Sequence, residues 1–445
     1  MFQQKERYVK PKRPLDISIN LNVRGMQPSS TLEINERSNR LIQEGREIFK
    51  FGLGQSPFPV PETVVEALRA NAFQKDYLPV KGLRPLRDSV AEYLYRTQNL
   101  TRDGDDVLVG PGSKELMFLL QLVYYGDLVI PRPSWVSYAP QASIIGRRVI
   151  WVPTKKENDW HLTPEELTQI CEGDPNKPRI VILNYPSNPT GRTYRLEELK
   201  KLAKVARAHR VVLLSDEIYG ELHHKGQHIS IARFYPEGTI ISGGLSKWCG
   251  AGGWRLGVFT FPTELRWLLD AIAAVASETY TSTSAPIQYA AVKAYQGGEE
   301  IDEYLQLCRR VLRALGRYCV SRLESFGIGV AAPKGAFYLF LDFSAYAAEL
   351  KQRGIETSGQ LCQQLLENRG VALLPGTDFG LSKNEYATRL SYVDFDGARA
   401  LRAAADYTQN QPLNGQFLQE YCPRVVRGVE LIGEWLTSTV SHNER

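Results

Sequence analysis

The chain has 445 residues, of which 43% are hydrophobic and 23% are charged, close to the average for soluble globular proteins. This composition excludes a disordered chain, a collagen-like repeat and a small disulfide scaffold, and at roughly 100–200 residues per domain the length indicates two or three domains. With 54 Lys and Arg against 49 Asp and Glu, the net charge is +5, too weak a bias to indicate a nucleic-acid or membrane partner.

The six cysteines form no C-x-x-C pair and no histidine cluster accompanies them, so we expect no metal site and no thioredoxin-like site. Reduced, mostly buried thiols in a cytoplasmic protein are the expected state. No segment approaches the ~18 apolar residues of a membrane span. Residues 1–15 are basic without a following apolar region, which predicts a basic arm rather than a secretory signal.

The first fifty residues carry mixed charge with little periodicity and predict an arm with a short helix. Beyond residue 107, short apolar runs alternate with amphipathic stretches, of which residues 196–210 have a clear helical period. This alternation predicts an α/β fold with a doubly wound, mostly parallel sheet covered by helices on both faces. The apolar runs predicted as strands are residues 107–110, 127–131, 148–153, 179–186, 211–219, 239–244 and 254–261.

The rest of the chain mixes helices and strands and predicts a smaller α+β domain that packs with the N-terminal arm. We therefore divide the chain into the arm with part of the small domain (1–57), a large domain (58–325) and a small domain with C-terminal helices (326–445). The elements expected beyond the large sheet are a helix over 301–326, strands within 327–343, a helix near 358–369, strands at 371–376 and 387–393, and helices after residue 397.

A glycine-rich segment, GPGSKE, follows the first of these strands. It matches neither a dinucleotide fingerprint nor a P-loop. Apolar residues continue it with a helical period, so Gly112, Ser113 and Lys114 open a helix at the carboxyl end of a strand. Free N–H groups and the helix dipole favour an anion there. An ordinary strand-to-helix turn is an equally good interpretation of this segment alone.

Three further predicted strands end on polar residues. Asn188 lies in the rigid loop NYPSNPTG, from which its amide can reach a ligand oxygen. Asp216 closes a buried strand, where a carboxylate is costly unless a cation meets it, and Tyr219 follows three residues later. Lys247 precedes a glycine-rich loop and then Arg255. A partly desolvated lysine can attack carbonyls, and an arginine can hold a phosphate with two hydrogen bonds.

These segments all lie at strand ends, where doubly wound sheets bind ligands, and together they provide what pyridoxal phosphate needs. The ordered motifs from about residue 51 to residue 394 resemble the class I/II aminotransferases of the aspartate aminotransferase superfamily, fold type I of the pyridoxal-phosphate enzymes. The resemblance implies a homodimer. It also implies ping-pong transfer of an amino group from an L-amino acid to a 2-oxo acid.

The resemblance assigns a role to each matching residue. It implies that Lys247, in SKWCGAGGWR, forms a Schiff base with the cofactor and moves the substrate proton, while Asp216 pairs with the ring nitrogen. It makes Tyr219 and Asn188 donors to the ring hydroxyl and Trp135 the ring that stacks on the cofactor. The remaining cofactor contacts that it implies are Gly112, Ser113, Lys114, Ser246 and Arg255 and, reaching the neighbouring subunit's phosphate, Tyr77.

The substrate contacts implied by the resemblance are Arg389, which holds the α-carboxylate, together with Gly54, Asn188 and Trp135. The sequence departs from the family pattern at two places. Gly244 stands where a serine often donates to the phosphate, although Ser246 directly precedes Lys247. Gln55 or Ser56 stands where a second glycine commonly offers its backbone to the substrate carboxylate.

The donor side chain is a separate question. The serine-rich stretch 281–292, which carries a distal arginine in one branch of the family, has no Arg or Lys, and Lys114 is assigned to the phosphate. Unless Arg24, Arg37 or Arg40 of the arm folds over the site, we expect neutral or aromatic donors to be better than aspartate.

Two alternatives remain open at this stage. Another pyridoxal-phosphate reaction on the same fold, a β-lyase or a synthase, is distinguished by whether a 2-oxo acid accepts the amino group stoichiometrically. A ligand-sensing regulator requires a DNA-binding module, and the first fifty residues show no helix-turn-helix pattern.

Overall fold

The computed structural model describes residues 19–408 and 411–437, so the basic arm expected at residues 1–15 lies outside the described part of the chain. The largest sheet has seven strands in the order β2-β8-β7-β6-β5-β3-β4. Only β8 runs antiparallel to its two neighbours within this sheet. Its strands are β2 (Val107–Gly110), β3 (Asp127–Arg132), β4 (Val149–Pro153), β5 (Arg179–Asn184), β6 (Val212–Asp216), β7 (Thr239–Gly244) and β8 (Gly257–Thr260).

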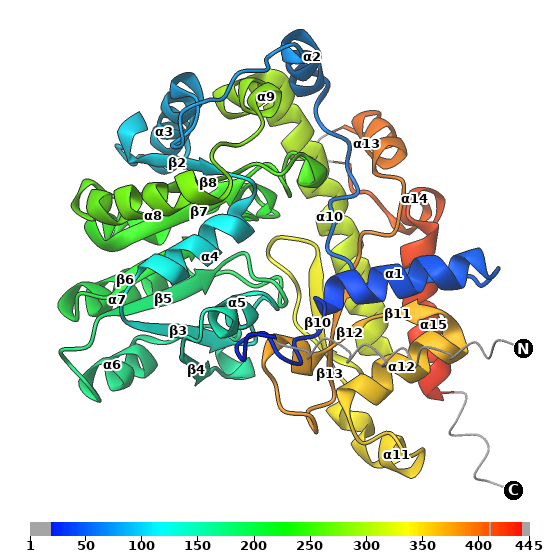
Figure 1. The fold of residues 1–445 in the computed structure, drawn as a ribbon. Coiled ribbons are helices and arrows are strands. Elements are labelled where there is room, and N and C mark those ends of the chain that lie inside the picture. Colours follow the sequence, from blue (N-terminus) through cyan, green and yellow to red (C-terminus); the bar gives the residue numbers. More distant parts are fainter. Residues whose placement is uncertain (1–18, 409–410, 438–445) are drawn as a thin grey trace, which may run out of the picture.

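Helices cover both faces of this sheet. Successive side chains along a strand point to opposite faces, and in these strands both sets are apolar and are buried under helices. Ile180 and Ile182 of β5 pack in the cluster that contains α4, α5 and α8, whereas Val181 and Leu183 pack with α6 and α7. The predicted doubly wound, mostly parallel sheet is therefore confirmed (Figure 1). The helices connected with it are α2 (Glu62–Asn71), α3 (Arg84–Gln98), α4 (Ser113–Val123), α5 (Tyr138–Ile144), α6 (Pro164–Glu172), α7 (Leu196–Ala208), α8 (Arg266–Thr279) and α9 (Ala285–Gln296).

A smaller α+β unit lies beside the large sheet, as the sequence predicts. The N-terminal β1 (Phe49–Lys50) pairs in parallel with β11 (Val371–Ala372), which joins the start of the chain to its C-terminal part. A four-stranded antiparallel sheet has the order β12-β13-β10-β9. Its strands are β9 (Gly329–Val330), β10 (Tyr338–Asp342), β12 (Leu374–Pro375) and β13 (Ala387–Ser391).

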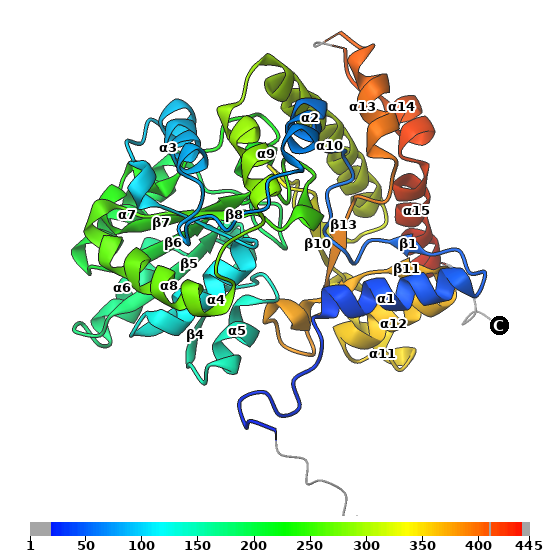
Figure 2. The ribbon, with the colours of Figure 1, turned by 45° about the horizontal axis from the view of Figure 1, so that its top comes forward.

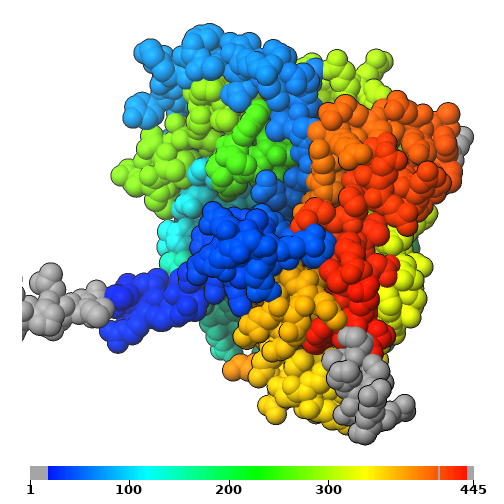
Figure 3. Space-filling view, turned by 90° about the vertical axis from the view of Figure 1, so that its right-hand side faces the viewer, coloured from blue at the N-terminus to red at the C-terminus, as the bar shows by residue number. Residues whose placement is uncertain are grey.

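Helices surround these short strands, and the long α10 runs beside them (Figure 2). Helix α1 lies at the surface, next to the C-terminal segments (Figure 3), and its Ile34 and Leu41 pack on Ile48 and Leu366. The boundaries proposed at residues 57 and 325 stay a prediction. The helices of this unit are α1 (Ser30–Gln43), α10 (Glu299–Ser325), α11 (Ala347–Gln352), α12 (Ser358–Arg369), α13 (Gly397–Ala405), α14 (Gly415–Tyr421) and α15 (Pro423–Thr437).

All six cysteines are free and buried. Within residues 19–408 and 411–437, no helix has the length and the apolar character that a bilayer crossing requires.

Candidate active site

The carboxyl ends of β2, β5, β6 and β7 lead to side chains that line one cavity of about 530 Å³. Parallel strands end at the same edge of a sheet, which explains why residues far apart in the sequence meet there. The smaller unit closes the cavity from the other side with residues of β10, β13 and the N-terminal segment. The predicted site residues that line it are Gly54, Ser113, Lys114, Trp135, Asn188, Asp216, Tyr219, Ser246, Lys247, Arg255 and Arg389.

An anion cradle lies where α4 begins. Gly112 directly precedes the helix with φ +96°, and a Cβ at this position would collide with the guanidinium of Arg255. Arg255 is held in place by hydrogen bonds from its guanidinium to the carbonyls of Gly252, at 2.9 Å, and Pro111, at 3.3 Å. The first N–H groups of a helix have no partner within the helix, so this end of α4 and Arg255 can bind a phosphate together.

The carboxylate of Asp216 is buried, with 3% of the residue exposed. Sequence reasoning expected a cation beside it, but no described residue forms an ion pair with it. Its partners are hydroxyl donors instead: Tyr138 at 2.5 Å from Oδ2 and Ser242 at 3.3 Å from Oδ1. Burial raises the pKa of Asp216 to about 6, against the opposing effect of these hydrogen bonds. A bound cation would therefore complete this site.

Lys247 lines the same cavity as Asp216. Its Nζ donates to the carbonyl oxygen of Gly54 at 2.5 Å and lies 5.7 Å from the ring centre of Tyr219. Burial, together with the positive charge of Arg389, lowers the pKa of Lys247 to about 8, although Asp216 opposes this shift. A neutral amine, the form that reacts with carbonyls, is consequently accessible close to physiological pH.

Arg389 comes from β13 and is 1% exposed. Its guanidinium donates to Oδ1 of Asn188 at 3.1 Å and to the carbonyl oxygen of Gly52, and its Cζ lies 4.8 Å from the ring centre of Tyr338. Its Nε has no hydrogen-bond partner within the described chain. A buried guanidinium with a spare donor is suited to a carboxylate ligand.

Tyr338 and Asn184 are among the cavity residues that the sequence analysis did not identify. Tyr338 lines the cavity, and its hydroxyl is 2.6 Å from that of Tyr219. Asn184 also lines it, and its amide donates to the main-chain oxygen of Asp216 at 3.0 Å. Tyr338 stands in an apolar strand pattern that indicates core, so the sequence contains no local signal for its role. Asn184 is a polar residue in the predicted strand 179–186, close to its carboxyl end, and this position is the sequence signal that could have identified it as a site residue.

The structure does not bring every predicted residue to the cavity. Tyr77 is 89% exposed and does not line it. Among the cavity residues described, none is Arg24, Arg37 or Arg40, and Arg37 pairs with Glu367 at 3.6 Å.

The two departures from the family pattern differ in their surroundings. Gly244 has φ +153°, and a Cβ there would lie 2.7 Å from the carbonyl oxygen of Leu256, so a serine at this position requires a backbone shift. Gln55 lines the cavity, whereas Ser56 is buried with its hydroxyl unpaired in the described chain.

Comparisons with known proteins agree with this geometry. The family model "Aminotransferase class I and II" matches residues 46–404. The aspartate aminotransferase of Geobacillus stearothermophilus is 35% identical over 380 residues, which cover 83% of this chain and 93% of that protein. The aspartate/prephenate aminotransferase of Thermus thermophilus is 31% identical over 376 residues, which cover 83% of this chain and 93% of that protein.

The fold agrees with the same relatives. The solved structure of Thermus thermophilus aspartate aminotransferase with maleate superposes with a TM-score of 0.80 at 28% identity, covering 94% of this chain and 99% of that one. The chain therefore belongs to the class I and II aminotransferases. It is an aminotransferase that uses pyridoxal 5'-phosphate and moves an amino group between an amino acid and a 2-oxo acid. The phosphate cradle, the buried lysine and a buried carboxylate that forms no ion pair with any described residue fit this cofactor.

Proposed function

We propose that the cavity holds pyridoxal 5'-phosphate with Lys247 as the attachment residue and Asp216 on the ring nitrogen. The observation that carries this assignment is that one cavity is lined by a buried lysine with a lowered pKa and by a buried carboxylate that pairs with no cation in the described part of the chain. Tyr219 and Asn188 are assigned to the ring hydroxyl, and Trp135 to the ring face.

The phosphate is assigned to the cradle at the start of α4. There the N–H group of Ser113, the hydroxyl of Ser246 and the guanidinium of Arg255 are the donors, while the N–H of Gly112 is already bonded to the carbonyl oxygen of Gly110 at 2.7 Å. Glycine at 112 supports this assignment, because a side chain would fill the space in front of Arg255. Ser246 lines the cavity. Its hydroxyl replaces the phosphate donor that a serine often supplies at the position of Gly244.

When bound, the cofactor supplies an electron sink for the bonds at the substrate Cα. Arg389 binds the substrate α-carboxylate, and the buried position of its guanidinium excludes water from that ion pair. Lys247 Nζ, in its neutral form, takes the proton from the substrate Cα and returns it as a general base and acid. Asp216 keeps its negative charge, which stabilises a protonated ring nitrogen.

The donor is proposed to be an acidic amino acid, with Lys114 binding its side-chain carboxylate. Lys114 Nζ has no hydrogen bond or ion pair within the described chain and lies 5.1 Å from the ring centre of Trp135, another cavity residue. Because the phosphate already has the cradle donors, Lys114 is available for a second anion. Similarity to relatives named aspartate aminotransferase supports the same choice. This proposal replaces the expectation of neutral donors, which rested on assigning Lys114 to the phosphate.

We also propose a cytoplasmic homodimer in which Tyr77 reaches the phosphate of the neighbouring subunit. The exposed aromatic side chain of Tyr77, outside its own cavity, supports the shared site. Six free, buried cysteines support a reducing compartment. The large domain, residues 58–325, is proposed to bind the cofactor.

Borohydride reduction of the loaded enzyme followed by peptide mass spectrometry tests the assignment of Lys247. We expect the cofactor on the peptide that contains Lys247 and on no other peptide. Lys247→Ala should keep the fold, by circular dichroism, and lose transamination. Cofactor on a different peptide, or turnover by Lys247→Ala at the parent rate, would refute the assignment. Half-reactions with a panel of amino acids, followed by cofactor absorbance with 2-oxoglutarate and pyruvate as acceptors, then identify the donor.

A further inference from the structure

Tyr138 stands directly behind the carboxylate of Asp216. It is the first residue of α5, it is 1% exposed, and its hydroxyl donates to Oδ2 of Asp216 at 2.5 Å. Its ring meets the ring of Trp135 edge-on, with ring centres 5.2 Å apart and an interplanar angle of 81°. One side chain therefore contacts both the carboxylate assigned to the ring nitrogen and the indole assigned to the ring face.

The next turn of α5 extends this contact to the phosphate cradle. Gln141 donates through its amide to the main-chain oxygen of Lys114 at 2.7 Å, and it accepts a hydrogen bond from Gln121 of α4 at 3.1 Å. Tyr138 and Gln141 are three residues apart within α5, a spacing that places their side chains on one side of the helix, and Trp135 lies in the segment that leads into α5. This side of α5 connects three separate parts of the cavity.

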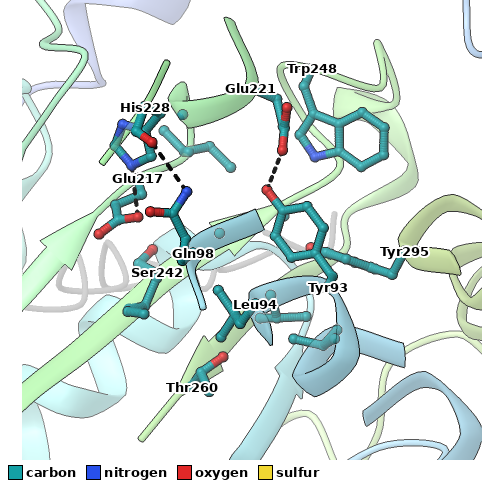
Figure 4. A pocket seen from close by; sticks show the side chains of 17 residues that line it. Tyr93, Leu94, Gln98, Glu217, Glu221, His228, Ser242, Trp248, Thr260 and Tyr295 are labelled. Carbon is teal, nitrogen blue, oxygen red and sulfur yellow. Dashed lines mark hydrogen bonds and ion pairs between the residues drawn. The ribbon is translucent and has the colours of Figure 1, made fainter. Parts of the chain in front are cut away.

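The other groups near Asp216 are weaker or point elsewhere. Ser242 donates to Oδ1 at 3.3 Å, the N–H of Ile218 also bonds the carboxylate, and Lys247 and Tyr219 face it from the cavity. The neighbouring Glu217 instead pairs with His228 at 2.8 Å beside a separate cavity of about 40 Å³, on whose wall Ser242 lies (Figure 4). A cavity of that volume has room for only a few water molecules. Within the described chain, Tyr138 is thus the only side-chain donor to Oδ2.

We propose that Tyr138 is a positioning residue, which orients the carboxylate of Asp216 toward the cofactor ring nitrogen and keeps it ionised. The inference rests on the proposed role of Asp216. A short O–H···O⁻ bond is among the strongest in proteins, and its loss leaves a buried charge with fewer donors. Burial and the nearby Asp216 raise the pKa of the Tyr138 phenol, so Tyr138 stays protonated and donates at neutral pH.

Tyr138→Phe removes one oxygen and retains the ring that packs on Trp135. We expect the dissociation constant of pyridoxal phosphate, measured by quenching of tryptophan fluorescence, to rise about tenfold or more. The pH midpoint of the bound cofactor's absorbance change should also rise. Without the Tyr138 hydroxyl, Asp216 is more basic and draws the shared proton away from the ring nitrogen. The positive charge on the ring is then smaller, so the cofactor group whose titration changes the absorbance keeps its proton to higher pH.

Tyr185→Phe is the matched control. Tyr185 is also 1% exposed, but its hydroxyl accepts hydrogen bonds from Ser215 and from the N–H of Ile231 rather than contacting Asp216. If Tyr138 has only a structural role, both substitutions should lower thermal stability, and neither should change the dissociation constant of pyridoxal phosphate or the pH midpoint. If Tyr138→Phe changes affinity and midpoint no more than Tyr185→Phe does, the proposal is overturned.

Two further variants separate this inference from the function on which it rests. Asp216→Ala must weaken cofactor binding if the assignment of Asp216 holds. Normal binding by that variant overturns the assignment, whereas weak binding by Asp216→Ala with normal binding by Tyr138→Phe overturns only the role of Tyr138. Site-specific 3-fluorotyrosine at position 138 covers the case in which Tyr138→Phe does not fold. Its more acidic phenol should lower the midpoint, and an unchanged or raised midpoint contradicts the proposal.

Discussion

Lys114→Met tests which anion Lys114 binds. Methionine retains an unbranched apolar side chain against Trp135 and removes the charge, so packing changes little. Two unit charges about 4 Å apart attract by about 4 kcal/mol at an effective dielectric constant of about 20. Desolvation offsets part of this attraction, and hydrogen bonds to charged groups contribute about 1.5–3 kcal/mol net.

Part of the desolvation of Lys114 is already present before substrate binds, because burial and Arg255 lower the pKa of its ammonium in the free protein. A loss of about 1.5–3 kcal/mol corresponds to a roughly 10- to 150-fold lower kcat/KM for aspartate. With alanine, which has no side-chain carboxylate, kcat/KM should stay within about twofold of the parent value, since no partner of the ammonium is lost.

The assay is kcat/KM for aspartate and for alanine, measured with the same acceptor at saturating pyridoxal phosphate. Lys177→Met is the matched control, because Lys177 precedes β5 at the amino end of the strand and pairs with Asp127 at 2.9 Å. An equal fall for both donors would assign Lys114 to the phosphate after all. A parent enzyme that prefers neutral donors would refute the acidic substrate.

Three further outcomes are expected. Gly112→Ala should weaken pyridoxal-phosphate binding in equilibrium dialysis by about tenfold or more, because φ is +96° and the added Cβ meets Arg255; unchanged affinity would argue against the cradle. The rate of covalent capture of the cofactor by the apoenzyme, measured by absorbance, should increase as the pH rises toward about 8 and level off above it. The reason is that the pKa of Lys247 is about 8 and only its neutral amine attacks the cofactor. A rate that does not depend on pH across this range would contradict the lowered pKa of Lys247. Mixing Tyr77→Phe with Lys247→Ala subunits should restore activity in hybrid dimers with one intact site, and activity that never exceeds that of the separate variants would exclude a shared site.

Much of this protein follows from local patterns in its sequence. Short apolar runs and helical periods repeat within ten to twenty residues, so they predict the large sheet and the helices on its faces. The polar residues that end these strands, among them Asn188, Asp216 and Lys247, are also predictable, because parallel strands end at one edge whatever the details of packing. The identity of the cofactor follows from residue types at those ends together with family resemblance.

Tertiary packing decides the contacts between elements far apart in the chain. Arg389 meets Asn188 across 201 residues only because β13 of the smaller unit lies over the edge of the large sheet. Tyr338 is indistinguishable from core in its strand, and Tyr138 bonds an acid 78 residues away. The partners of Asp216 are decided in the same way. Charge balance predicts a cation beside this buried carboxylate, and the packing of α5 supplies a phenol and leaves that cation to a ligand.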